Sequence, residues 1–133
     1  MSNAAGTGPA TLTGQYASKV WVNFNGKGTV AIRDSQNVSS LTDNTTGDYT
    51  VSYTSNMLDA NHSFSINGIS ANYSVRGGAY LGTKVDDLLN TNTASFYSSS
   101  SHTIDCAYGA YSAGNASALD ADTVCLQTFG DLA

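Results

Sequence analysis

The sequence predicts an all-β protein, and three observations lead to that prediction. Charged residues make up only 11% of the chain and glutamate is absent, so strong helix formers are scarce. Apolar and polar residues alternate in several short runs, which is the period of a half-buried strand. Clusters of Asn, Asp and Gly separate these runs and suit tight turns. About eight short strands predict a single-domain antiparallel β-sandwich, jelly-roll-like, over residues 19–133, behind a short N-terminal arm of residues 1–18.

Length and charge limit the classes of partner. A chain of 133 residues is long enough for one domain with a real core. Its formal net charge is −5, and its few Lys and Arg residues argue against nucleic acid, since phosphate binding needs clustered basic residues. No apolar run is long enough to cross a membrane, and the N-terminus lacks the basic and apolar regions of a signal peptide. We therefore expect no nucleic-acid or membrane partner.

The arm is expected to be an attachment segment. Its stretch Gly6-Thr7-Gly8-Pro9 cannot hold a regular element. Leu12 and Tyr16 are the side chains that can anchor it on another protein, by burial or by adding strand hydrogen bonds.

Three or four strands are expected between residues 19 and 54. Alternation predicts that apolar rows face the core, and these rows comprise Val20 and Val22; Val30 and Ile32; and Tyr49, Val51 and Tyr53. Arg33 follows one of these rows and is expected to face solvent or to cap a turn.

The middle of the chain carries weaker signals. Residues 55–61 suggest a connection, and Phe64 and Ile66 begin a strand. Asn67-Gly68 is the strongest hairpin dipeptide, so a returning strand is expected over residues 69–76. Residues 84–89 fit either a helical turn or an irregular loop. A short strand is expected at residues 95–97, followed by an exposed serine run at 98–101.

Two further strands complete the expected sandwich. In residues 102–111 one face carries Ile104, Cys106 and Tyr108, and in residues 123–129 one face carries Val124, Leu126 and Thr128. Cys106 and Cys125 are interpreted as small, buried, reduced residues. The alternative is that they lie on neighbouring strands and pair in an oxidising medium.

The sequence does not indicate an enzyme. His62 and His102 are interpreted as surface polar residues, and we find no nucleophile elbow, phosphate loop or zinc spacing. Three acid groups could attract Ca²⁺, namely Asp43 with Asp48, Asp86 with Asp87, and Asp120 with Asp122. We interpret them as solvated turn residues, so no catalytic residue, metal or cofactor is expected.

A binding surface is the better-supported kind of site. Tyrosine and asparagine on loops suit recognition of a sugar or a protein, because Tyr offers rigid area and Asn offers hydrogen bonds. The candidate recognition residues lie in the loop-rich second half and are Tyr80, Tyr97, Tyr108 and Tyr111.

One stretch also resembles a known family. Residues 21–54 read WVNFNGKGTVAIRDSQNVSSLTDNTTGDYTVSYT, and residues 122–129 read DTVCLQTF. Both are similar to a small β-module of tailed-bacteriophage virion surface proteins of the marine and cyanophage type, which is found at tail-fibre C-termini and on particle surfaces. Residues 122–129 look like the family's closing strand.

The resemblance implies a structural role on the virion surface. It suggests a capsid decoration or cement protein, a homotrimeric knob assembled in the host cytoplasm. The arm would hold the knob on the major capsid protein or on other virion proteins. The alternative is the receptor-binding tip of a tail fibre that recognises a host surface glycan. A polysaccharide hydrolase is a weaker alternative, because no carboxylate pair stands out.

Overall fold

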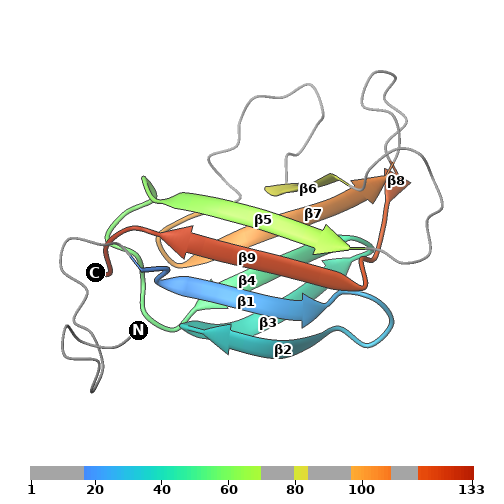
Figure 1. Ribbon diagram of the computed structural model, residues 1–133, viewed down its shortest axis with the longest axis horizontal. Coiled ribbons are helices and arrows are strands. Elements are labelled where there is room, and N and C mark those ends of the chain that lie inside the picture. The colour runs from blue at the N-terminus through green and yellow to red at the C-terminus, as the bar shows by residue number, and fades with distance from the viewer. Residues whose placement is uncertain (1–16, 70–79, 84–96, 109–116) are drawn as a thin grey trace, which may run out of the picture.

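The computed structural model describes residues 17–69, 80–83, 97–108 and 117–133. These residues form strands and connections without a helix, as Figure 1 shows. The strands, in chain order, are β1 (Val20–Asn25), β2 (Ala31–Gln36), β3 (Val38–Thr45), β4 (Asp48–Tyr53), β5 (Ser63–Ile69), β6 (Tyr80–Thr83), β7 (Ser101–Tyr108), β8 (Ser117–Ala118) and β9 (Thr123–Phe129).

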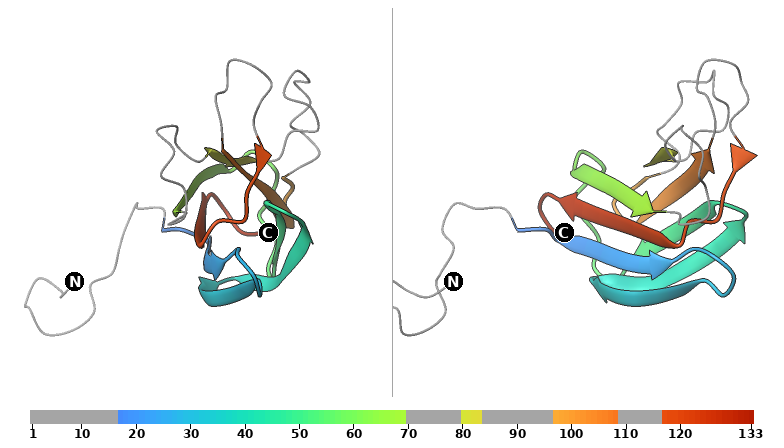
Figure 2. Two further views of the ribbon diagram at one scale, coloured as in Figure 1. Left: turned by 90° about the vertical axis from the view of Figure 1, so that its right-hand side faces the viewer. Right: turned by 45° about the vertical axis from the view of Figure 1, so that its right-hand side comes forward.

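Two antiparallel sheets pack face to face, which confirms the predicted β-sandwich. One sheet has the order β2-β1-β9-β5, and the other has the order β3-β4-β7-β6, with β8 added beside β7. The two layers are seen separately when the molecule is turned (Figure 2). The last strand, β9, lies between β1 and β5 and pairs with both of them.

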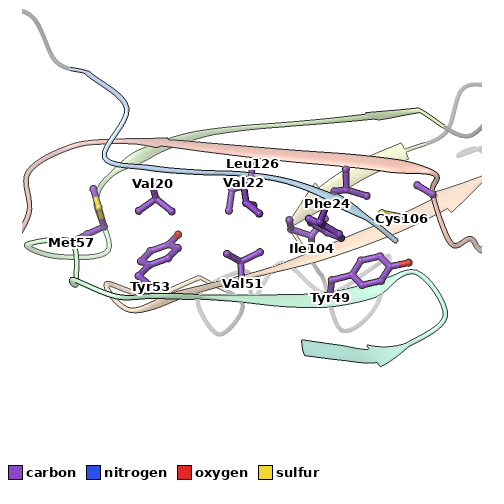
Figure 3. Packing of buried hydrophobic residues seen from close by; sticks show 12 residues of the cluster. Val20, Val22, Phe24, Tyr49, Val51, Tyr53, Met57, Ile104, Cys106 and Leu126 are labelled. Atoms are coloured by element: carbon purple, nitrogen blue, oxygen red, sulfur yellow. The ribbon is translucent and has the colours of Figure 1, made fainter. Parts of the chain in front are cut away.

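The core forms where the alternating rows of the two sheets meet (Figure 3). Val20, Val22 and Phe24 of β1 are buried opposite Tyr49 and Val51 of β4. Val124, Leu126 and Thr128 of β9 are fully buried, as alternation predicts. The inward positions are mostly apolar, so burying them is the main term that stabilises the sandwich.

Asn37 turns the chain from one sheet to the other. Its φ is +58°, a left-handed conformation that Asn tolerates better than most residues. Its side chain accepts from the Ser55 backbone N–H at 2.7 Å and donates to the Ser55 carbonyl at 2.9 Å. The Asn37 carbonyl accepts from the Thr54 N–H. These bonds join the corner between β2 and β3 to the residues that follow β4.

Strand β2 carries a β-bulge at Arg33, and one of its predicted core residues is exposed. Asn23 pairs with Asp34 while Phe24 pairs with Ile32, so Arg33 is the extra residue. Val30 packs against the core, but Ile32 is 39% exposed, so its predicted place in the core is wrong. The physical reason is that β2 is an edge strand, and the neighbouring sheet does not cover Ile32.

The predicted hairpin at Asn67-Gly68 is wrong. Strand β5 continues through both residues, which pair with Cys125 and Val124 of β9. Pairing with a central strand over seven residues therefore overrides the local turn preference. The strand that was expected to return over residues 69–76 lies outside the described residues after Ile69, as does the segment 84–89.

The connection after β4 contributes to the core, which the sequence did not suggest. Met57 is buried and forms an isolated bridge with Leu132. Its N–H donates to the Ser99 carbonyl, while Ser98 Oγ accepts from the N–H groups of Ser100 and Ser101. The serine run is thus an ordered turn docked on the connection, in place of the expected exposed run.

The two cysteines are free and lie in different sheets. Cys106 is buried on β7, and Cys125 is half-buried on β9. The idea that they lie on neighbouring strands is therefore wrong. Burial, with help from the charges of Asp105 and Asp120, raises the pKa of the Cys106 thiol to about 12. That thiol stays protonated at neutral pH and is unreactive as a nucleophile.

Candidate functional site

Tyr97 belongs to a cluster of four rings at the end of the sandwich where β5 and β7 begin. Its backbone bridges to His102, and the two rings stack with centroids 5.7 Å apart. The Phe64 ring lies 5.4 Å from Tyr97, and the His62 ring lies 5.9 Å from it. We call His62, Phe64, Tyr97 and His102 the aromatic cluster. Of the four predicted recognition tyrosines, Tyr97 is the one that the structure places at a described side-chain assembly.

His102 is the buried centre of the aromatic cluster. Its side chain has no exposed surface, and the Phe64 ring lies edge-on to it at 4.4 Å. Burial lowers the pKa of His102 to about 4, and the charge of His62 adds to this lowering. The expectation that both histidines are surface residues is therefore wrong. A neutral, enclosed imidazole packs as an aromatic ring and cannot reach a substrate in solvent.

His62 links the aromatic cluster to a shallow surface pocket. Its Nδ1 lies 3.0 Å from the Asp59 carbonyl oxygen, which accepts the ring N–H. The side chain is buried, and its Nε2 has no hydrogen-bond partner among the described residues. The residues that line the pocket are Leu58, Asp59, Asn61, His62, Gly130 and Asp131.

The aromatic cluster can serve as a contact surface. Phe64 is 37% exposed and Tyr97 is half-buried, so both present ring area to solvent above the enclosed His102. Rings held in this way offer apolar area at little cost in conformational entropy, which suits a flat partner such as a sugar ring or another protein.

The other predicted recognition residues are not gathered at the aromatic cluster. Tyr80 pairs with Ala107, and Tyr108 pairs with Ser117, so their backbones lie at the opposite end of β7 from His102. Six residues of strand separate His102 from Tyr108, which corresponds to roughly 20 Å. Tyr111 and the predicted anchors of the arm, Leu12 and Tyr16, lie outside the described residues.

The opposite end of the sandwich is held together by one buried hydroxyl and one carboxylate. Tyr49 Oη lies 2.6 Å from the Gly26 carbonyl oxygen and 3.0 Å from Asp120 Oδ1, and its one proton is shared between these two acceptors. The same Asp120 oxygen accepts the Gly47 N–H at 2.8 Å. Burial and then the bond to Asp120 raise the Tyr49 pKa far above its usual value, so the hydroxyl keeps its proton. We call this set the Tyr49–Asp120 junction.

Asp48, Asp120 and Asp122 have structural partners, which corrects their interpretation as solvated turn residues, whereas Asp43 is exposed as expected. Asp48 is buried and accepts from Asn44 Nδ2 at 2.9 Å. Asp122 forms an ion pair with Lys27 at 3.7 Å, and its carbonyl accepts from Arg33 at 2.6 Å. Within the described part of the chain, His, Cys, Asp and Glu form no group of three that could hold a metal ion. The pair Asp86 and Asp87 lies outside it.

The sequence contains a signal for the burial of His102. His102 precedes Ile104 and Cys106 by two and four residues, so it belongs to the same inward row. No sequence signal indicated that Phe64 would reach across to His102, because β5 and β7 belong to different sheets.

No protein-family model matches the chain, and no curated protein and no solved structure matches it either. No helix that could span a membrane is present among the described residues.

Proposed function

We propose that this chain is a structural protein of the bacteriophage virion surface, a capsid decoration or cement-type knob. The proposal rests on the sequence resemblance, and one structural observation supports it. The two resembling segments, 21–54 and 122–129, form one block, because β9 pairs with β1 from Val20–Thr128 to Phe24–Val124. The first strand of one stretch thus lies beside the strand formed by the other, although 67 residues of sequence separate the two stretches, as parts of one module should do.

The role assigns separate tasks to the domain and to the arm. The domain forms the exposed knob, and the arm of residues 1–18 lies over the major capsid protein or another virion protein. Leu12 and Tyr16 supply the apolar contacts of the arm. A protein that binds only the assembled shell stabilises that shell by linkage, since its binding free energy is lost when the shell comes apart.

Truncation tests this division of tasks. A chain without residues 1–16 should fold, because the described contacts of the sandwich begin at Ser18. It should not bind to virions that lack the protein, whereas the full chain should bind in a co-sedimentation assay. Leu12→Ser/Tyr16→Ser is the matched variant that keeps the length of the arm. Binding of the truncated chain at full strength would place the attachment site in the domain and overturn this proposal.

A second candidate function is a receptor-binding tip that recognises a host surface glycan. The observation in its favour is the exposed ring area of Phe64 and Tyr97 beside a polar pocket. The test is binding of the labelled chain to host cells before and after periodate oxidation of the surface sugars. Loss of binding with Tyr97→Ala, and its retention with Gln127→Ala on the outer face of β9, would favour this function.

A further inference from the structure

The four edge strands of the sandwich differ in how they discourage pairing with another chain. Edge strands commonly carry charges or bulges or are very short, because a bare edge is a template for a further strand. β2 carries Arg33, Asp34 and one bulge. β3 carries Asp43 and two shifts of register, and β6 has only four residues.

β5 carries none of these devices. It is seven residues long, Ser63–Ile69, and pairs with β9 in unbroken register. It contains no proline, and none of the chain's fifteen charged residues lies in it. Its opposite edge is paired with no strand of the described residues. Phe64 and Ile69 add exposed apolar surface, with Ile69 68% exposed. Figure 1 shows β5 at the upper edge of its sheet.

We propose that β5 is the site where a second copy of this chain binds, by antiparallel pairing of β5 with β5 about a two-fold axis through Ile66, which gives a dimer in place of the homotrimer that the sequence resemblance suggests. Charge favours a second copy at this edge, because two chains of formal net charge −5 repel each other least along an uncharged strand. The pairing would join the two four-stranded sheets into one continuous sheet.

The side chains of β5 complement themselves in this register. Phe64 faces Gly68 of the second copy, so a ring covers a residue that has no side chain. Ile66 faces Ile66 on the inner side, where it already packs against the core. On the outer side Ser65 faces Asn67, and both residues are exposed and able to hydrogen bond. All seven residues find partners, which any shift of register would prevent.

Sedimentation equilibrium of the full chain with a charge-matched pair of variants tests the proposal. Ser65→Lys/Asn67→Lys adds two positive charges to the outer side of β5, where they face each other across the axis. Ala31→Lys/Asp34→Asn changes the net charge by the same amount on the edge strand β2, by adding one positive charge and removing one negative charge. We expect a dimer for the wild type and for the β2 variant. For the β5 variant we expect a dimer dissociation constant raised by tenfold or more, about the effect of one lost strong contact.

Several outcomes would overturn it. A wild-type protein that is monomeric or trimeric would contradict the proposal. A dimer that both variants leave intact, or that both variants weaken equally, would also contradict it. Far-UV circular dichroism and thermal melting show whether each variant folds, and the substituted β5 residues are exposed. Ser65→Cys/Asn67→Cys in a Cys125→Ser background tests the register independently. It should form a disulfide-linked dimer on oxidation, and absence of that dimer would exclude this register. The inference concerns self-association alone, so particle-binding results do not bear on it.

Discussion

Strand β4 places one buried tyrosine at each end of the sandwich, and the two are held in different ways (Figure 3). Tyr49 gives its hydroxyl two hydrogen-bond acceptors in the Tyr49–Asp120 junction. The Tyr53 hydroxyl is buried and meets no partner at full hydrogen-bond geometry among the described residues, although it interacts with the Thr128 side chain. Its end of the sandwich depends on packed rings and on Met57. One end is therefore fixed by directed polar contacts, and the other by apolar area around the neutral His102.

The two ends differ in how strictly they constrain the backbone. The Tyr49–Asp120 junction joins three connections through backbone groups and needs glycine at close approaches. A Cβ on Gly26 would lie 2.8 Å from Tyr49 Oη and 2.9 Å from the Ala121 carbonyl oxygen. The aromatic cluster tolerates less regular geometry, because the hydrophobic effect that drives burial of the rings is non-directional. We therefore expect substitutions at the two ends to respond to different variables, backbone geometry at one and pH at the other.

The largest effect is expected between the two ends, at Val51, which both ends need in place. Val51→Asp buries an unpaired charge at a fully buried site, which costs several kcal/mol against a typical stability of roughly 5–15 kcal/mol. The variant should not fold, as judged by loss of a cooperative thermal transition. Thr42→Asp, at an exposed position of β3, is the control and should fold. A cooperative, soluble Val51→Asp protein would show that the inward face is wrong.

Gly47→Ala should break the polar end. The Gly47 φ is +72°, and a Cβ there would meet the Cys106 carbonyl oxygen. Left-handed strain and the backbone contact together should cost about 3 kcal/mol. Gly28→Ala is the matched control, because its φ is +68° but its Cβ would have open space. It should cost about 1 kcal/mol. Equal losses for both variants in urea unfolding would argue against the close approach.

The aromatic end should respond to pH through His102. Its folded pKa, about 4, lies below the usual 6.5, so only the unfolded chain takes up the proton between these values. The contribution of His102 to the free energy of unfolding is fully present above pH 6.5. It decreases as the pH falls toward 4 and is lost below pH 4. The loss is on the order of 3 kcal/mol. His102→Gln should remove this part of the pH dependence. Urea unfolding curves of the variant and of the wild type, recorded between pH 4 and pH 6.5, measure the difference. If the free energy of unfolding of His102→Gln depends on pH as steeply as that of the wild type, the burial of a neutral imidazole is contradicted.

The smallest effects compare the two tyrosines directly. Tyr49→Phe removes the donor to Gly26 and Asp120 and should cost about 1–3 kcal/mol, because the Gly26 carbonyl loses this partner while Asp120 keeps the Gly47 N–H. Tyr53→Phe removes a buried hydroxyl that makes no hydrogen bond of full geometry and interacts only with the Thr128 side chain, so we expect a change of roughly 0.5 kcal/mol or less. Thermal melting of the two variants measures both values. Equal destabilisation would remove the distinction between the ends.

The sequence predicts the sandwich better than it predicts the site. Strict alternation identified the inward rows of β1, β4 and β9, because each of these strands is covered over its whole length. Alternation gives the face of Ile32, which pairs with the buried Phe24, but β2 is an edge strand and the side chain is left exposed. The Asn67-Gly68 signal failed because pairing with β9 decides the course of β5. Local sequence does not report which strands meet across the two sheets.

The aromatic cluster depends on such a meeting. His62 and Phe64 come from the start of β5, while Tyr97 and His102 come from around the start of β7, 33 or more residues later. Their contact follows from the sheet order, so spacing in the sequence could indicate each ring but not the cluster. The tyrosines that were expected to act together are divided between the two ends of β7 for the same reason.

The central claim is the place of this protein on the virion surface, and immunogold labelling of intact particles tests it most directly. Antibodies against the folded domain should label the head uniformly, and particles made without the gene should show no label. That result would support the decoration role and make the arm the functional element. Label confined to the tail end would contradict that role in favour of the receptor-binding tip. Absence of label from intact particles, with the antigen present in the infected cell, would contradict both.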